Sequence, residues 1–232
     1  MFFYYFATRF KGAADHPQLR QARSVNCNAM MTKQNDNGKN KKYNIDCNNS
    51  LTLMSCPTNK NMTTKYGKIK IDYKGKQVTA RKLTVTSEIS IDIDTAWSKV
   101  QTSALLEFVA DGKVRFNPTG GHFPDIWKEG DTVSTKMLVY GFVPFGGLHS
   151  LYFEKIDTEN KILQSREWDN SSKVWNHKIS LKKLTDKTII YEDEIVIYGG
   201  ILTGFITSWA KSFYKHRQKR WQLVATNSTL KK

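Results

Sequence analysis

The last thirty or so residues of the chain carry the pattern of one long amphipathic helix. Large apolar residues recur there at spacings of three and four, with no proline between them: Leu202, Phe205, Ile206, Trp209, Phe213 and Val224. Gly199 and Gly200 mark the start of this helix, and Asn227 with Ser228 mark its end. At 1.5 Å per residue the helix would be about 40 Å long, so its apolar side needs a broad partner surface.

The residues before this helix predict such a surface, because they read as a run of β-strands. A first strand with clean alternation begins near Leu83, and two short helices follow it, the first capped by Asp94 and the second within 106–110. Six further extended stretches then alternate with turn residues: 114–117, 132–142, 149–156, 162–168, 174–184 and 188–198. Strands joined by short turns form an antiparallel sheet, and only the terminal helix is long enough to cover one face of it. This order predicts an α+β fold.

The positive charge of the chain is concentrated ahead of this predicted domain. Residues 1–82 hold 16 Lys/Arg against 4 Asp/Glu, whereas residues 83–232 hold 20 against 17. The stretch 26–64 is rich in Asn, Lys, Thr and Ser and has few large apolar residues, and residues 1–64 as a whole are predicted to form a disordered basic tail. Residues 65–82 are predicted to be a short extended lead-in outside the domain, and the domain itself is predicted to span 83–228.

Other interpretations of the tail stay open. One is that the natural protein begins near Met62 and that the upstream residues are a translation of non-coding sequence. Another is a mitochondrial presequence, although serine is scarce in it. A basic tail beside a nearly neutral domain gives little reason to expect nucleic acid, whereas contact of the tail with an anionic membrane surface stays open. The apolar run at residues 1–8 is far too short to span a bilayer.

All three cysteines, Cys27, Cys47 and Cys56, lie in the tail. Their spacing matches no zinc pattern, and their odd number argues against a closed disulfide framework. A core that needs no bridges fits a reducing compartment, so we expect a cytoplasmic location. We also expect a monomer. The histidines show no metal-ligand spacing, and the chain has no phosphate loop, nucleophile elbow or dinucleotide fingerprint. We therefore expect neither a metal nor a cofactor.

Residues 83–224 resemble the START-like superfamily, which includes the birch-pollen allergen fold, polyketide cyclase/dehydrase domains and lipid-transfer proteins. The residues that carry the resemblance are Ser87 to Asp94 with Trp97, Trp175 to Ile179 with Tyr191 to Ile195, and Phe213 to Trp221. The last two sets look like those of a bacterial branch of the superfamily. The resemblance implies a helix-grip fold, in which a curved seven-stranded antiparallel sheet wraps around the long C-terminal helix. It implies little about activity, because the superfamily contains binders, carriers and cyclases.

The resemblance also implies an apolar cavity between the concave face of the sheet and the helix. Such a cavity would bind a small hydrophobic molecule. The side chains expected to line it are Trp127, Met137, Tyr140, Phe142, Phe153, Trp168, Trp175, Tyr191, Trp209, Phe213 and His216. The alternative is that the aromatic residues among them simply fill the core.

One histidine is predicted to face this cavity with carboxylates beside it. Alternation puts His177 on the apolar side of its strand and Asp193 on the apolar side of the next, and Glu167 faces the same way one strand earlier. A three-residue turn between the two later strands would set His177 opposite Asp193, whereas a two-residue turn would set it opposite Glu194. These three residues, His177, Asp193 and Glu167, are the candidate catalytic set. The alternatives are an anchor for a polar ligand group and a satisfied structural pair.

Charged residues near the end of the long helix have two interpretations. Arg217 and Arg220 flank the apolar stripe, that is, the row of large apolar residues along this helix. There they can meet sheet carboxylates or an anionic ligand head. Alternatively, they can be solvated charges that complement the helix dipole. His149 begins a strand and carries no strong signal. Three functions stay open: a binder or carrier of a small hydrophobic molecule, an enzyme of cyclase, dehydratase or hydrolase type, and an accessory protein whose basic tail contacts anionic surfaces.

Overall fold

The computed structural model describes residues 30–34, 40–44 and 61–229, with side chains for residues 61–225. The chain divides into two units, Met1–Cys56 and Pro57–Lys232. In the first unit, β1 (Met30–Gln34) pairs antiparallel with β2 (Asn40–Asn44), so a short hairpin lies within the stretch predicted to be a disordered tail. The rest of that prediction up to residue 60, and the three cysteines, lie outside the described residues.

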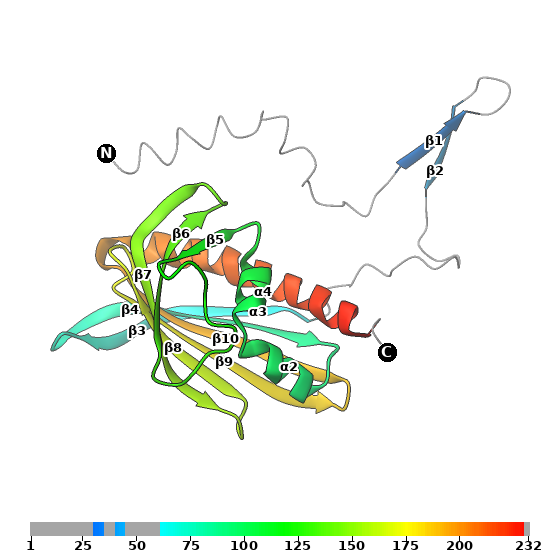
Figure 1. The fold of residues 1–232 in the computed structure, drawn as a ribbon. Coiled ribbons are helices and arrows are strands. Elements are labelled where there is room, and N and C mark those ends of the chain that lie inside the picture. Colours follow the sequence, from blue (N-terminus) through cyan, green and yellow to red (C-terminus); the bar gives the residue numbers. More distant parts are fainter. Residues whose placement is uncertain (1–29, 35–39, 45–60, 230–232) are drawn as a thin grey trace. The chain divides into compact units, whose positions relative to one another are not determined.

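The second unit contains one antiparallel sheet of eight strands and a long C-terminal helix (Figure 1). Along the sheet the strand order is β3–β4–β10–β9–β8–β7–β6–β5. The strands are β3 (Thr63–Tyr73), β4 (Lys76–Ile89), β5 (Val114–Pro118), β6 (Thr132–Val139), β7 (Val143–Asp157), β8 (Ile162–Trp168), β9 (Val174–Thr185) and β10 (Thr188–Tyr198). The helices are α2 (Ile93–Val100), α3 (Ser103–Ala110) and α4 (Thr203–Thr229), with a 3₁₀ turn, η3 (Gly200–Leu202), leading into α4. The sheet curves around α4, which confirms the predicted α+β helix-grip fold.

The sheet has eight strands where seven were expected, because β3 joins it at one edge. β3 pairs with β4 along its whole length, around a turn at Lys74 and Gly75. The stretch 65–82 therefore belongs to the sheet, and the prediction that it lies outside the domain is wrong. Most residues of β3 are exposed, as is usual for a charged edge strand, so its sequence lacks the apolar alternation of an inner strand.

The two short helices lie close to their predicted positions, with earlier starts. Asp92 is the N-cap of α2, since its carboxylate accepts the backbone N–H of Thr95 at 2.8 Å. The sequence had favoured Asp94 for this role. α3 begins at Ser103 rather than within 106–110, because the hydroxyl of Thr102 caps it by accepting the N–H of Leu105 at 3.2 Å.

One side of α4 is buried, and it is not wholly apolar. Its buried residues are Thr203, Ile206, Thr207, Ala210, Phe213, Tyr214, Arg217, Gln218, Trp221 and Ala225. α4 packs against β4, β10 and α3, and its two halves belong to two separate hydrophobic clusters. Of the predicted stripe, Phe205 is 41% exposed and Trp209 is half-buried. The apolar pattern misplaced the stripe because it left out the polar residues Arg217 and Gln218, which face the sheet.

Alternation along the chain breaks between β6 and β7. Lys136 pairs with Leu148 but Met137 pairs with Phe145, so two extra residues of β7 bulge from the ladder. These residues are Gly146 and Gly147, whose φ values of 73° and 74° favour glycine. The bulge bends β7, and a turn of residues 140–142 separates β6 from β7. The sequence had instead extended the preceding strand to residue 142.

No helix within the described residues is long and apolar enough to cross a membrane. The fold does not test the expected monomeric state or the expected cytoplasmic location, and both stay predictions. The same holds for contact between the basic tail and a membrane surface.

Candidate functional site

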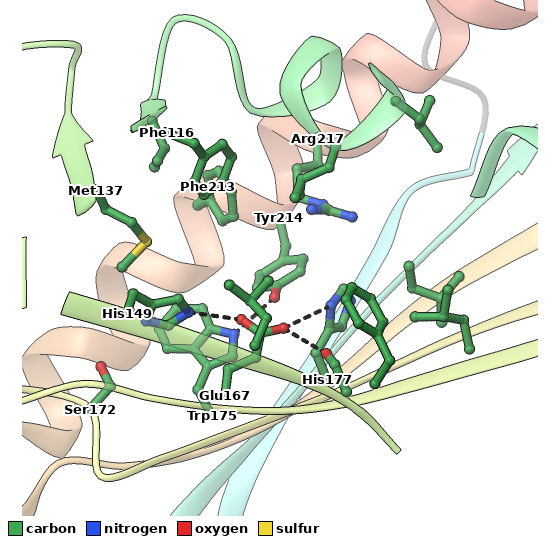
Figure 2. Close-up of a pocket in the computed structure, with 18 of the residues that line it drawn as sticks. Phe116, Met137, His149, Glu167, Ser172, Trp175, His177, Phe213, Tyr214 and Arg217 are labelled. Carbon is green, nitrogen blue, oxygen red and sulfur yellow. Dashed lines mark hydrogen bonds and ion pairs between the residues drawn. The ribbon is translucent and has the colours of Figure 1, made fainter. Parts of the chain in front are cut away.

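A cavity of about 80 Å³ lies between the concave face of the sheet and α4 (Figure 2). Strands β5 to β9 and helices α2, α3 and α4 all contribute to its wall. Much of that wall is apolar and includes Phe116, Met137, Leu151, Phe153, Trp175 and Phe213. The polar groups of the wall gather together, and they include His149, Glu167, Ser172, His177, Tyr214 and Arg217. An apolar space with a few convergent polar groups is the usual form of a small-molecule site.

The structure brings many of the predicted cavity residues together. Trp127, Met137, Phe153, Trp175, Trp209 and Phe213 line the cavity, as do His177 and Glu167. Trp127 stacks on Phe153 with ring centres 4.6 Å apart, and Trp209 stacks on Phe213 at 5.2 Å. These two stacked pairs supply aromatic surface from separate parts of the fold.

Five predicted cavity residues lie elsewhere. Tyr140 and Phe142 belong to the turn after β6, where Tyr140 has a φ of 54° and Phe142 is 53% exposed. Trp168 is also exposed. Tyr191 is fully buried but does not line the cavity, and its ring packs on Trp221. The remaining residue, His216, places its Nε2 2.7 Å from the backbone oxygen of Asp111, at the end of α3.

His177 and Asp193 form the expected pair, although not in either expected register. Nε2 of His177 lies 2.8 Å from Oδ1 of Asp193. In the ladder, however, His177 pairs with Ile195, and an irregularity at Thr188 sets this register. The two side chains meet diagonally, since both point to the same face from positions two residues apart. Glu194 points to the other face, where it pairs with Lys82 at 2.8 Å.

Asp193 is fully buried and links three elements of the fold. Besides His177, it accepts hydrogen bonds from the hydroxyl of Tyr191 at 3.1 Å and from Nε2 of Gln218 at 3.2 Å. Burial raises the pKa of Asp193, but the charge of Arg217 and the hydrogen bond from His177 outweigh burial and hold that pKa below its usual value. Asp193 is therefore a carboxylate at neutral pH, and it connects β10 to β9 and α4.

Arg217 comes from α4 and is only 4% exposed. Its guanidinium lies over the rings of Tyr214 and Phe213, at 5.3 and 5.8 Å from their centres. Its closest carboxylate oxygen is that of Asp193, 3.9 Å from Nη2. Arg217 thus lies beside a carboxylate of the sheet and is not a solvated charge. Arg220 instead binds the backbone oxygen of Phe108 and the carboxylate of Asp111 at the end of α3.

A second buried histidine, which the sequence did not single out, lies beside Glu167 (Figure 2). Nδ1 of His149 is 2.9 Å from Oδ2 of Asp169, and its Nε2 is 3.1 Å from Oε2 of Glu167. Burial lowers the pKa of His149, but the hydrogen bonds and charges of these two carboxylates raise it to about 9. His149 is therefore an imidazolium at neutral pH, and both of its ring nitrogens donate.

A signal for His149 was present in the sequence. It has the same position in the strand alternation as Leu151 and Phe153, which are buried on the cavity side. Sequence reasoning assigns His149 to neither face, because the predicted strand begins at His149. Asp169 could not have been found in this way, since it lies just beyond the end of β8.

Glu167 lies between the two imidazoles (Figure 2). Its Oε2 accepts from His149, and its Oε1 accepts from the hydroxyl of Ser165 at 2.6 Å and lies 3.9 Å from Nδ1 of His177. Burial raises the pKa of Glu167, but the hydrogen bond and charge of His149 outweigh burial and lower that pKa. Glu167 is thus an ionised carboxylate whose charge His149 balances.

The loop after β8 is fixed by Asp169. Its Oδ1 accepts the backbone N–H groups of Ser171 and Ser172 at 2.7 and 2.6 Å, and this turn places Ser172 in the cavity wall. The bulge in β7 makes room for it, because a Cβ atom on Gly146 would come within 2.5 Å of the Asp169 carboxylate. The glycines of β7 and the loop thus position one side of the site together.

The arrangement can hold a polar group and can exchange a proton with it. Among residues 61–225, no cluster of three His, Cys, Asp or Glu side chains is placed to hold a metal ion. His177 is fixed through Nε2 by Asp193, and its other ring nitrogen lies in the cavity wall beside Glu167. An imidazole held in this way can orient a bound molecule or act as an acid or base.

Solved structures match this chain in fold. Protein Ms6760 from Mycobacterium smegmatis has a TM-score of 0.50 and 9% sequence identity, covering 62% of this chain and 89% of that one. A START superfamily protein from the same organism has a TM-score of 0.47 and 8% identity, over 63% and 97% of the two chains. Ginseng major latex-like protein 151 from Panax ginseng has a TM-score of 0.49 and 12% identity, over 62% and 96%.

No protein-family model matches the chain, and no curated protein matches it in sequence. The element order and the curved sheet around α4 give the chain the START-like helix-grip fold that the sequence resemblance implied. At identities this low, the likeness concerns the fold alone.

Proposed function

We propose that this protein binds a small, mainly apolar molecule with one polar group in the cavity between the sheet and α4. The observation that carries the proposal is the composition of the cavity wall, in which aromatic and aliphatic side chains converge on one buried polar cluster. The apolar walls would supply affinity, and the polar cluster would fix the orientation of the ligand. A dry cavity of about 150 Å³ binds benzene, so a cavity of about 80 Å³ favours a compact ligand.

Native mass spectrometry of the protein purified from its natural host tests this proposal. We expect a defined mass excess that disappears on denaturation. Met137→Trp should abolish the excess, because Met137 lines the cavity and a larger side chain there fills it. Phe142→Trp is the matched control, since Phe142 lies in the exposed turn. A mass excess that survives in both variants would place the ligand outside the cavity.

The second candidate function is an enzyme of cyclase, dehydratase or hydrolase type, with His177 as its general acid or base. The observation that favours it is the orientation of His177, which Asp193 holds at 2.8 Å while Glu167 lies 3.9 Å from the other ring nitrogen. Incubating the extracted ligand with fresh protein separates the two functions. An enzyme would convert the molecule, and His177→Gln would bind it without converting it. A binder would release it unchanged.

A further inference from the structure

His177 presents one unbonded ring nitrogen at the cavity (Figure 2). Its Nε2 is 2.8 Å from Oδ1 of Asp193, and an ionised carboxylate can only accept, so Nε2 carries a hydrogen and donates it to Asp193. Its Nδ1 has no hydrogen-bond partner among the described residues, since the nearest carboxylate oxygen, Oε1 of Glu167, is 3.9 Å away. The side chain keeps 7% of its surface exposed and Nδ1 is not fully enclosed, so a molecule in the cavity can reach this nitrogen.

The bonding around Nδ1 makes it an acceptor. A hydrogen on Nδ1 would give a buried cationic ring whose second N–H has no acceptor within hydrogen-bond distance among the described residues, and unpaired charged donors are costly in the interior. A neutral ring that holds its hydrogen on Nε2 avoids this cost and leaves a lone pair on Nδ1. Nδ1 of His177 therefore fits a ligand group that donates a hydrogen bond.

The charges around the cavity also favour a donor over an acceptor. The charged cluster beside Nδ1 holds two cations and three carboxylates: Arg217, His149, Glu167, Asp169 and Asp193. His149 lies between the carboxylates of Asp169 and Glu167, at 2.9 and 3.1 Å, so one negative charge is left over. Of these two carboxylates, Glu167 lines the cavity. An excess negative charge at the wall repels the lone pairs of a carbonyl, ether or carboxylate oxygen and attracts a polar hydrogen.

We propose that the ligand is an alcohol or a phenol, whose hydroxyl donates to Nδ1 of His177 and whose apolar part lies against Trp175 and Phe213. This inference rests on the proposed function and adds the chemical class of the ligand. A hydroxyl supplies a donor without the cost of moving a full charge into an apolar cavity, which an ammonium group would require. Groups that only accept hydrogen bonds leave Nδ1 unpaired and face the excess negative charge.

1-Butanol and methyl propyl ether test the need for a donor. The two molecules have the same atoms and nearly the same size, but only the alcohol can donate a hydrogen bond. Titration of the full chain, followed through the methyl NMR signals of the cavity, compares their affinities. A buried hydrogen bond that cannot form corresponds to a difference of roughly 5- to 100-fold in affinity, so 1-butanol should bind at least about fivefold more tightly than the ether.

The ring ¹⁵N signals of His177 test the same contact without any substitution. In the ligand-free protein at neutral pH, ¹H–¹⁵N correlations should show a hydrogen on Nε2 and none on Nδ1. 1-Butanol should shift the Nδ1 signal saturably, at the same concentrations at which it shifts the methyl signals of the cavity. Methyl propyl ether should shift the Nδ1 signal far less.

Two histidine variants locate the partner of the hydroxyl. His177→Gln removes Nδ1 but keeps an amide N–H that can reach Asp193, so 1-butanol should bind more weakly and the two probes should bind about equally. His216→Gln is the matched control. It should keep the preference for 1-butanol, because His216 does not line the cavity and its Nε2 lies 2.7 Å from the backbone oxygen of Asp111. If His177→Gln does not fold, the ring ¹⁵N signals of the unaltered protein decide.

The outcomes separate this inference from the proposed function. A hydrogen found on Nδ1 in the ligand-free protein overturns the acceptor role of that nitrogen, and equal binding of the two probes overturns the preference for a donor. Either result leaves the cavity as a binding site. A preference that persists in His177→Gln, or an Nδ1 signal that 1-butanol leaves unmoved, overturns the role of His177. Failure of both probes to shift the methyl signals of the cavity would count against the proposed function itself, and with it against this inference.

Discussion

At the scale of single residues, Asp193 holds together side chains from β9, β10 and α4. We predict that Asp193→Ala lowers the free energy of unfolding by about 3–5 kcal/mol, because it leaves the buried charge of Arg217 and the ring of His177 without their carboxylate. Glu194→Ala is the matched control on the neighbouring residue. Glu194 pairs with Lys82 on the outer face, and exposed pairs contribute about 1 kcal/mol or less. Urea unfolding of both variants measures the difference, and equal losses would contradict the structural role of Asp193.

The raised pKa of His149 predicts that the stability of the protein depends on pH above neutrality. Its pKa in the folded protein, about 9, lies above the ordinary value of 6.5, so the folded state binds the proton more tightly than the unfolded state. The stabilisation is therefore complete below about pH 6.5 and is lost as pH rises through 9. The free energy of unfolding should fall by up to about 3 kcal/mol over this interval.

The variant His149→Gln provides the control for this prediction. It removes the titrating group, so urea unfolding measured between pH 6.5 and 9.5 should show a much weaker pH dependence than the natural sequence. Stability of the natural sequence that stays constant across this interval would show that His149 is not held as an imidazolium.

Residue-level reasoning from the sequence reached part of this site. Alternation along the strands placed His177, Asp193 and Glu167 on the inner face, because facing depends only on the period of a strand. It did not give the register, which depends on a local irregularity at Thr188. It also missed His149, the partner of Glu167, because His149 stands at the start of the predicted strand, although it shares the alternation of the buried Leu151 and Phe153.

At the scale of secondary-structure elements, the position of the two tryptophans on α4 predicts how much each contributes to stability. Trp221 is fully buried and contacts Tyr191, whereas Trp209 is half-buried and lines the cavity. Trp221→Ala should therefore lower the free energy of unfolding by about 3–5 kcal/mol, the usual cost of emptying a buried aromatic site. Trp209→Ala should lower the free energy of unfolding clearly less, because the ring of Trp209 already borders the cavity. Thermal and urea unfolding compare the two, and a larger loss for Trp209→Ala would mean that the buried side of α4 is misassigned.

The elements themselves were largely predictable, and the exceptions have physical causes. The long helix, both short helices and the six strands after them follow from apolar periodicity and turn residues. The bulge of β7 was not predictable, since Gly146 is required there by the carboxylate of Asp169, which is distant in sequence. β3 was underestimated because an exposed edge strand rich in lysine has little apolar contrast.

At the scale of the whole molecule, the described sheet and helices lie within the unit Pro57–Lys232, and the hairpin of β1 and β2 lies in the other unit. The excess positive charge of the chain falls mostly in its first 82 residues, whereas the cavity and its polar cluster are built from Val100 and residues after it. The binding function that we propose therefore depends on the second unit, and a role for the basic tail at anionic surfaces stays a separate prediction.

Titration of methyl NMR signals with 1-butanol tests the central claim most directly. 1-Butanol is compact and mainly apolar and has one polar group, as the proposed ligand class requires. We predict saturable shifts of the methyl signals of Met137, Leu151 and Ile179, which line the cavity. The signals of Ile69 on β3 and of the exposed Leu184 should stay unchanged, since both residues lie away from the cavity. Shifts that fail to saturate, or that are as large at Ile69 and Leu184 as in the cavity, would contradict a binding site between the sheet and α4.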